Sequence, residues 1–352
     1  MTSVYSKIQK HTSYQVPDDW LCVKTMDMHT AGEPLRVITA GFPELKGANV
    51  LERRAHLKQN YDHLRTALML EPRGHRDMYG CILLPPDDKD ADFGILFMHN
   101  EGYSTMCGHA IIAVTKLAVK MGWVEPYDGE VQIKIDAPCG RITSFASLND
   151  DELSSVHFYG VPSFLVELDQ KITLAGFGEI KYDLAYGGAF YAYVDADHHG
   201  VKLEQDNYHQ LIQLGKDIKR EVIRTNNKIK HPFEKDLSFL YGTIFISNKT
   251  NGRADSRNVC IFANGEVDRS PTGSGVSGRM AIHHARSEIQ VGQPMVIESI
   301  IGTTFNGSVI QEVSYGPYQA VIPRVEGTAY VVGQNEFIID PNDPLKDGFV
   351  LG

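Results

Sequence analysis

Cysteine is scarce in this sequence, and its spacing excludes the usual cysteine-based frameworks. The 352 residues contain five cysteines, an odd number, and no two of them form a C-x-x-C pair. This pattern fits neither a disulfide-stapled secreted domain nor a structural zinc site. We therefore expect reduced thiols, most of them buried within or beside strands, namely Cys22, Cys81, Cys139 and Cys260. The remaining one, Cys107, lies in a different setting that is described below.

Long apolar runs and an excess of basic residues are also missing. No stretch reaches the ~18 apolar residues that a membrane-spanning helix needs, and residues 1–20 contain no apolar segment typical of a secretory signal. The formal net charge is −10, from 34 basic and 44 acidic residues, which argues against a nucleic-acid or anionic-membrane partner. Neither a metal-binding cluster nor a lysine-centred cofactor motif is apparent. These absences predict a soluble, cytoplasmic protein.

The chain does contain ample apolar material for a core, at 42% hydrophobic residues, and its length predicts about two domains. Short runs rich in Val, Ile and aromatic residues predict strands, which begin at residues 21, 35, 79, 93, 131, 190, 258 and 329. Helices are expected over about 49–70, 107–121, 202–226 and 272–288. The first and third are amphipathic, as is typical of an outer face, whereas the second is apolar nearly all round and should be buried.

The two halves of the sequence share a weak internal repeat. In the first half "FMHN" precedes "STMCGHA", and "IDAPCG" follows about 30 residues later. In the second half "IFAN" precedes "SPTGSGV", and "IESIIG" follows at a similar distance. Each half thus places a Cys-Gly or Thr-Gly pair at the start of an expected helix. Such a repeat predicts two similar subdomains, each of which directs a helix N-terminus at a common cleft.

The thiol of Cys107 stands at the start of the helix expected over 107–121, with Ser104 and Thr105 as candidate N-caps. A thiol at this place faces the positive end of the helix dipole and unpaired N–H groups, which stabilise a thiolate. A single cysteine is more often a buried structural residue. The position at a helix start favours a reactive role for this one.

Residues beside the two helix starts complete a binding pattern. Gly108 lets the backbone approach a ligand closely, and His109 either bonds the ligand or the thiolate, or is a simple polar cap. Gly273 and Ser274 offer further backbone N–H groups to an anion. Asp268 either closes the turn or accepts a hydrogen bond from a cationic amine. Together these features predict α-proton abstraction from a small amino acid, because N–H donors on its carboxylate stabilise the resulting enediolate.

Five segments, taken in order, resemble the proline racemase family over almost the whole chain from about residue 20. They are "MDMHTAGEPLRVI", "EPRGHRDMYGCIL", "FMHNEGYSTMCGHAIIA", "YGGAFYAYVDA" and "DSRNVCIFANGEVDRSPTGSGVSG". The resemblance implies an α+β, diaminopimelate-epimerase-like fold of two pseudo-symmetric subdomains, each with strands wrapped round a central helix. It also implies a homodimer without a cofactor. We expect a polar tail over 1–19, a first subdomain over 20–160 joined by 335–352, and a second subdomain over 161–334.

Within this family the sequence is most similar to the trans-3-hydroxy-L-proline dehydratases. The family's racemases and 4-hydroxyproline epimerases carry a Cys in each of two catalytic segments, whereas the second position here is Thr272, as in the dehydratases. A Thr hydroxyl is far too weak an acid–base group to replace a thiol. The resemblance implies that Cys107 accepts the proton. The substrate-binding residues that it implies are Gly108, His109, Asp268, Gly273 and Ser274.

The implied reaction converts trans-3-hydroxy-L-proline into Δ1-pyrroline-2-carboxylate and water. The hydroxyl of this imino acid lies on the same face of the ring as the α-hydrogen, so a single base on that face serves the elimination. Two alternatives stay open. One is a hydroxyproline epimerase or proline racemase that works with one Cys, and the other is an inactive amino-acid-binding protein of the same fold.

Overall fold

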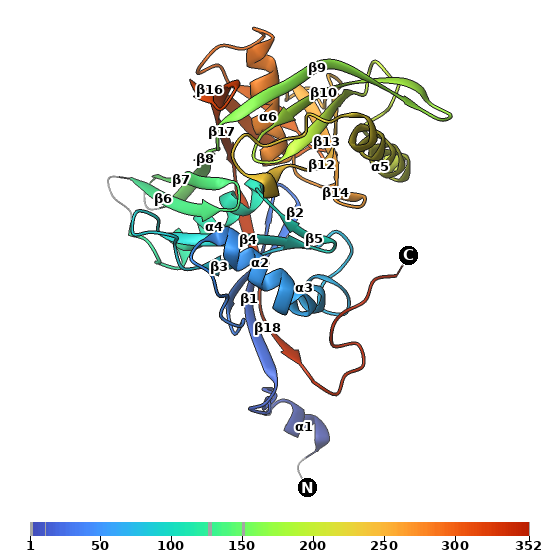
Figure 1. Cartoon of the computed structure of the whole chain (residues 1–352). Helices are drawn as coiled ribbons and strands as arrows, with labels where there is room; N and C mark the ends of the chain where they lie inside the picture. The colour runs from blue at the N-terminus through green and yellow to red at the C-terminus, as the bar shows by residue number, and fades with distance from the viewer. Residues whose placement is uncertain (1–2, 11, 126–128, 150–151, 352) are drawn as a thin grey trace.

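Two helices, each at the centre of one half of the chain, organise this protein. The computed structural model describes residues 3–10, 12–125, 129–149 and 152–351, so positions 1, 2 and 11 of the expected tail lie outside the described residues. One half lies above the other in Figure 1, and the N-terminal tail extends away from the lower half. The arrangement confirms the expected α+β fold of two related subdomains.

The helices confirm three of the four expected segments and divide the fourth. They are α1 (Val4–Ile8), α2 (Val50–Asn60), α3 (Asp62–Met69), α4 (Gly108–Lys120), α5 (Tyr208–Thr225) and α6 (Gly273–Ala285), with short 3-10 turns η1 (Gln205–Asn207) and η2 (Lys235–Leu237). The single helix expected over 49–70 was wrong, because the chain leaves the helical conformation at Tyr61, with φ −133° and ψ 18°. A new helix begins at Asp62, whose carboxylate pairs with Arg65 at 2.8 Å and lies at the favourable, positive end of α3.

The structure contains more strands than the sequence predicted. They are β1 (Leu21–Thr30), β2 (Glu33–Ala40), β3 (Tyr79–Leu84), β4 (Phe93–His99), β5 (Gly102–Ser104), β6 (Glu130–Ala137), β7 (Gly140–Asn149), β8 (Glu152–Tyr159), β9 (Ser163–Leu174), β10 (Gly178–Tyr186), β11 (Phe190–Asp195), β12 (Leu240–Ser247), β13 (Ser256–Phe262), β14 (Glu266–Asp268), β15 (Met295–Glu298), β16 (Thr304–Tyr315), β17 (Tyr318–Gly327) and β18 (Ala329–Ile339). All eight expected strands are present. The strands that the sequence did not reveal include β9 and β16, which carry many polar residues on a solvent-facing side.

The internal repeat is confirmed by the order and pairing of the elements. In the first half, β4 pairs antiparallel with β5, α4 follows, β6 returns parallel to β4, and β7 pairs antiparallel with β6. In the second half, β13, β14, α6, β15 and β16 follow one another with the same pairings. The two central helices therefore occupy equivalent places in the two halves.

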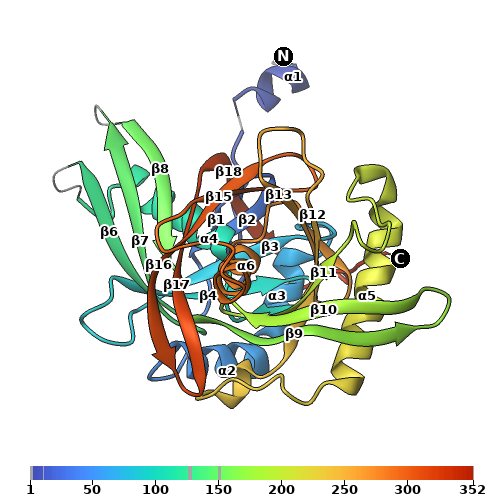
Figure 2. The same cartoon turned by 90° about the horizontal axis from the view of Figure 1, so that it is seen from above.

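Each central helix is buried at its N-terminal part. In α4 every residue from Gly108 to Ala118 is buried, as its apolar sequence predicted, and in α6 the same holds from Gly273 to Ile282. Figure 2 shows α6 at the centre of the view, with strands of the second half around it. This burial places the two helix N-termini inside the protein and not at its surface.

Strand pairing places the C-terminal segment in the first half and connects the two halves. β18 pairs antiparallel with β1 along its whole length, so the C-terminal segment lies in the first half. β17 pairs with both β8 and β9, which makes the sheet continuous from one half to the other. The subdomain boundaries at 160 and 334 stay predictions, because no break in the strand pairing marks them.

Candidate active site

The N-termini of α4 and α6 meet at a contact between two glycines. A Cβ atom added to Gly108 would lie 2.6 Å from the Cα of Gly273, and one added to Gly273 would lie 2.7 Å from the Cα of Gly108. The carbonyl of Cys107 accepts the first helical hydrogen bond of α4, and that of Thr272 accepts the first one of α6. Cys107 and Thr272 are therefore the N-cap residues of two helices that point at each other, in equivalent positions of the repeat.

A small cavity of about 20 Å³ lies at this junction, which is roughly the space that one water molecule needs. Its wall is formed by Tyr79, Met106, Cys107, Gly108, His109, Tyr191, Tyr241, Cys260, Phe262, Asp268, Thr272, Gly273 and Ser274. All seven residues that the sequence singled out are among them, although the two groups are more than 150 positions apart in the chain. Their roles in catalysis and binding stay predictions.

The thiol of Cys107 differs from its expected state. Its Sγ lies 3.2 Å from Nδ1 of His109, but burial raises the pKa of the thiol well above its usual range. The backbone N–H of Ala110 and the hydroxyl of Tyr79 lower that pKa without reversing its direction. The expectation of a net stabilised thiolate was therefore wrong, because desolvation of a charge in the interior outweighs the helix N-terminus.

The expected N-caps of α4 were also wrong. No side chain caps this helix. Thr105 Oγ1 donates to the carbonyl of Gly188 at 2.7 Å, and Ser104 Oγ shares a short hydrogen bond with the hydroxyl of Tyr79. Both hydroxyls thus have tertiary partners, and neither is available to the first N–H groups of α4, which have no partner within the helix.

His109 is neutral in this setting. Burial lowers its pKa to about 3, and its ring makes an edge-on contact with Tyr79 at a centroid distance of 4.9 Å. The hydroxyl of Thr30 donates to the His109 carbonyl at 2.8 Å, which fixes the backbone here. A neutral imidazole acts on the neighbouring thiol through a hydrogen bond and not as a positive counter-ion.

Thr272 combines a rare backbone conformation with an unpaired hydroxyl. Its φ is +67°, a region that β-branched residues seldom occupy, and such outliers cluster at functional sites. Its Oγ1 is buried and makes no hydrogen bond of ordinary geometry within the described residues, although Cys260 and Asp268 lie close to it. Its N–H donates to Ser270 Oγ at 3.1 Å. The hydroxyl therefore borders the cavity as a polar group that a ligand can satisfy.

Asp268 both shapes the turn and borders the cavity, so the two interpretations offered by the sequence are compatible. Its Oδ1 accepts a hydrogen bond from the N–H of Ser270 at 2.8 Å. Burial raises the pKa of its carboxyl group. On the same side, the hydroxyls of Ser274 and Tyr191 are hydrogen-bonded at 2.8 Å, which orients the first turn of α6.

Six residues of the cavity wall were not singled out by the sequence, and Cys260 is the most notable. It is buried in β13, as expected, but its thiol faces the Thr272 side of the cavity. Burial raises the pKa of its thiol, as does the nearby Asp268, whereas the neighbouring Thr272 hydroxyl lowers it. No local motif separates Cys260 from the other strand cysteines, because only the position of α6 makes this strand face part of the site.

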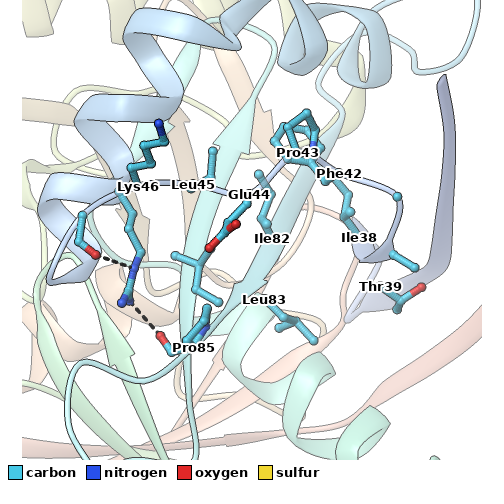
Figure 3. A pocket seen from close by; sticks show the side chains of 15 residues that line it. Ile38, Thr39, Phe42, Pro43, Glu44, Leu45, Lys46, Ile82, Leu83 and Pro85 are labelled. Carbon is cyan, nitrogen blue, oxygen red and sulfur yellow. Dashed lines mark hydrogen bonds between the residues drawn. The ribbon is translucent and has the colours of Figure 1, made fainter. Parts of the chain in front are cut away.

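A larger hollow of about 470 Å³ shares no residue with this cavity. It lies between β3 and the loop from Gly41 to Gly47, and Arg53 bonds the carbonyls of Gly47 and Pro85 in its wall (Figure 3). Of its three charged residues, Glu44 and Lys46 are exposed and Arg53 is buried. Among the described residues, none of the buried polar atoms without a partner borders this hollow. We therefore assign the site to the helix junction.

Two further features of the described residues bear on function. None of their helices is long and apolar enough to cross a membrane. No group of three or more His, Cys, Asp or Glu side chains among them is arranged to hold a metal ion.

Comparison with known proteins gives a consistent assignment. Residues 25–350 match the proline racemase family. The chain is 49% identical over 334 residues to a protein of Colwellia psychrerythraea named trans-3-hydroxy-L-proline dehydratase, covering 95% of this chain and 94% of that protein. It is 42% identical over 329 residues to a protein of Burkholderia multivorans named 3-hydroxyproline 2-epimerase, covering 94% of this chain and 98% of the relative.

A solved structure shares the fold as well as the sequence pattern. The crystal structure of a hydroxyproline epimerase from Agrobacterium vitis, with bound trans-4-hydroxy-L-proline, superposes with a TM-score of 0.87. The two sequences are 30% identical, and the match covers 94% of this chain and 96% of the other. With a family match over nearly the whole chain and relatives at 49% and 42% identity, this chain belongs to the proline racemase family.

Proposed function

We propose that this protein is a dehydratase that converts trans-3-hydroxy-L-proline into Δ1-pyrroline-2-carboxylate and water without a cofactor. The observation that carries the proposal is the unequal chemistry of two equivalent positions: one helix begins at the thiol of Cys107 and the other at the hydroxyl of Thr272. Inversion at Cα needs an acid–base group on each face, whereas syn elimination needs one. The relative named trans-3-hydroxy-L-proline dehydratase supports this choice.

In the proposed reaction the carboxylate of the substrate lies between the two helix N-termini. The unpaired N–H groups of the first turns, including those of Gly108 and Gly273, stabilise the enediolate that forms when the α-proton leaves. Cys107 in its thiolate form takes that proton. Burial disfavours this thiolate in the free protein, but the positive charge of the substrate amine beside it favours its formation, and once formed it is a strong base for a weakly acidic C–H bond. The hydroxide then leaves C3, and the enamine product becomes the Δ1-imine.

The amine of the substrate is assigned to Asp268. Its buried carboxylate is within the cavity wall, and a cationic ring nitrogen supplies the opposite charge that a buried carboxylate requires. The present cavity of about 20 Å³ is smaller than a proline ring, so binding involves a widening of the junction. We also propose a homodimer and a cytoplasmic location, which the family resemblance and the five free cysteines suggest.

A second candidate function is epimerisation of 3-hydroxyproline at C2. It is favoured by the relative named 3-hydroxyproline 2-epimerase and by the thiol of Cys260, which interacts with Thr272 on the far side of the cavity. In that reaction Cys260 would supply the second proton. Cys260 lies within β13 and not at a helix start, so its thiolate lacks the stabilisation that a helix N-terminus gives, which makes Cys260 the less suitable acid–base group of the two thiols.

The test is product analysis with the stereoisomers of 3-hydroxyproline and 4-hydroxyproline and with proline. The proposal predicts an imine product from trans-3-hydroxy-L-proline alone. Cys107→Ala should lower the rate of imine formation by at least ~10²-fold, since it removes the base. Cys260→Ala should keep the rate of the unmodified protein. An epimerase would instead convert the substrate into its C2 epimer and would depend on Cys260. An inactive binding protein would give no product with any substrate.

A further inference from the structure

The dehydration leaves one proton transfer without an assigned residue. Hydroxide is a poor leaving group, and departure from C3 is assisted when an acid protonates the oxygen as the bond breaks. The 3-hydroxyl lies on the face of the ring that Cys107 approaches. The acid is therefore expected among the groups that surround Cys107 in the first half of the chain.

Tyr79 occupies that place. It lies at the start of β3, is buried, and lines the cavity beside Cys107. Its hydroxyl shares a short hydrogen bond with Ser104 Oγ. Its ring is held between two histidines, at centroid distances of 5.7 Å from His99 and 4.9 Å from His109. The position of this hydroxyl is thus fixed on three sides.

A second tyrosine lies near Tyr79, and the two hydroxyls form a place where a hydroxyl group of the ligand can bind. Tyr241 comes from β12 of the other half and also lines the cavity. Its hydroxyl is buried and makes no hydrogen bond of ordinary geometry within the described residues, although the hydroxyls of Tyr79 and Ser104 lie close to it, and a bound hydroxyl group supplies the missing partner. Electrostatic interactions link the Tyr241 hydroxyl to Tyr79 and to Cys107, so the two phenols and the thiol gather at one end of the cavity.

We propose that Tyr79 is the general acid of the dehydration, which protonates the 3-hydroxyl as the C3–O bond breaks, and that Tyr241 helps to bind this hydroxyl. The inference rests on the proposed function. The Cys107 thiolate takes the α-proton, and the electron pair of the C–H bond becomes the C2–C3 double bond while the C3–O pair leaves with oxygen. Tyr79 gives its proton to that oxygen, and water forms.

The cycle closes when the Cys107 thiol returns a proton to the Tyr79 phenolate. The proton removed from Cα thus replaces the one that leaves in water, and no other reactant is needed. Ser104 supports the step, because its hydroxyl donates to the phenolate oxygen while the charge is present. Both residues border the cavity, and burial raises the pKa of the Tyr79 hydroxyl well above its usual range, so a Tyr79 phenolate is a strong base that takes the proton back.

The experiment compares two leaving groups in the purified protein. Trans-3-fluoro-L-proline presents fluoride at the same position, and fluoride is a much weaker base than hydroxide, so it leaves with little help from an acid. Tyr79→Phe should lower the rate of dehydration by at least ~10², in the range that general acids contribute, while fluoride release stays within about threefold of the unmodified protein. The readouts are imine formation and free fluoride.

A matched control separates chemistry from packing. Tyr193 is also buried, and its hydroxyl donates to the carbonyl of Gly275 at 3.1 Å, but it does not line the cavity. Tyr193→Phe should leave the ratio of dehydration to fluoride release unchanged. The acid role of Tyr79 would be refuted, and the proposed function would stand, if Tyr79→Phe lost both activities equally or dehydrated as fast as the unmodified protein. If the unmodified protein dehydrates no trans-3-hydroxy-L-proline, the proposed function itself fails.

Discussion

The contact between Gly108 and Gly273 allows a quantitative prediction for Gly108→Ala. The added methyl group would lie 2.6 Å from the Cα of Gly273, whereas ordinary van der Waals contact begins near 3.4 Å. The obstacle is backbone, which no side-chain rotation removes. The two helix N-termini must therefore move apart by roughly 0.8 Å, the difference between these distances.

A displacement of this size affects activity more than stability. Overpacking of a core costs about 1–3 kcal/mol in the free energy of unfolding, which a protein of this size tolerates. A misplacement of about 1 Å among groups that bind one substrate lowers catalysis by ~10²-fold. We expect Gly108→Ala to fold, with a lowered melting temperature, and to lose about two orders of magnitude in kcat/KM for imine formation.

Gly327→Ala is the control for overpacking alone. Its methyl group would meet an atom at 2.7 Å, the Cδ1 of Phe305, but between β17 and β16, neither of which lines the cavity. This variant should show a similar loss of melting temperature and keep kcat/KM within a few-fold. The reasoning would be refuted if Gly108→Ala had the activity of the unmodified protein, or if both variants lost activity equally.

Three further predictions follow from the site. Asp268→Ala should raise KM more than Asp268→Asn, because the amide oxygen still accepts a hydrogen bond from the substrate nitrogen; equal loss of melting temperature in both with unchanged kinetics would assign Asp268 to the turn alone. Thr272→Cys should gain racemisation of proline, seen in heavy water as D-proline with deuterium at Cα, and should retain dehydration; a folded variant that dehydrates but forms no D-proline contradicts the equivalence of the two helix starts. Stability should fall below about pH 6.5, because burial lowers the pKa of His109 to about 3 and that of His157 to about 4, so that the unfolded chain binds protons which the folded protein does not. For His109 the slope is at most ~1.4 kcal/mol per pH unit, and chemical denaturation at pH 7 and pH 5 measures it; equal stability at both values argues against a neutral, buried His109.

The sequence revealed those parts of the site that local patterns encode. Cys107 and Thr272 were found because each precedes a glycine at the start of an expected helix, and the repeat linked the two. The burial of α4 followed from its composition. These features depend on neighbours within a few positions, which is the range over which a single sequence is informative.

Features that depend on tertiary contacts were missed or wrongly assigned. Ser104 and Thr105 were expected to cap α4, but partners from distant segments bind both hydroxyls. The dipole of α4 suggested a lowered thiol pKa, whereas burial, which the sequence does not show, raises it. Tyr241 and Cys260 lie on strands like many others, and only the packing of the second half directs them at the cavity.

The central claim is that only the Cys107 face of the site exchanges protons with the substrate. It is tested most directly by following trans-3-hydroxy-L-proline in the unmodified protein and by measuring the imine and the C2 epimer, cis-3-hydroxy-D-proline, at early times. We expect imine to account for all of the consumed substrate. Formation of the C2 epimer at a rate comparable to that of the imine would show that the Thr272 face delivers protons, and would contradict the account.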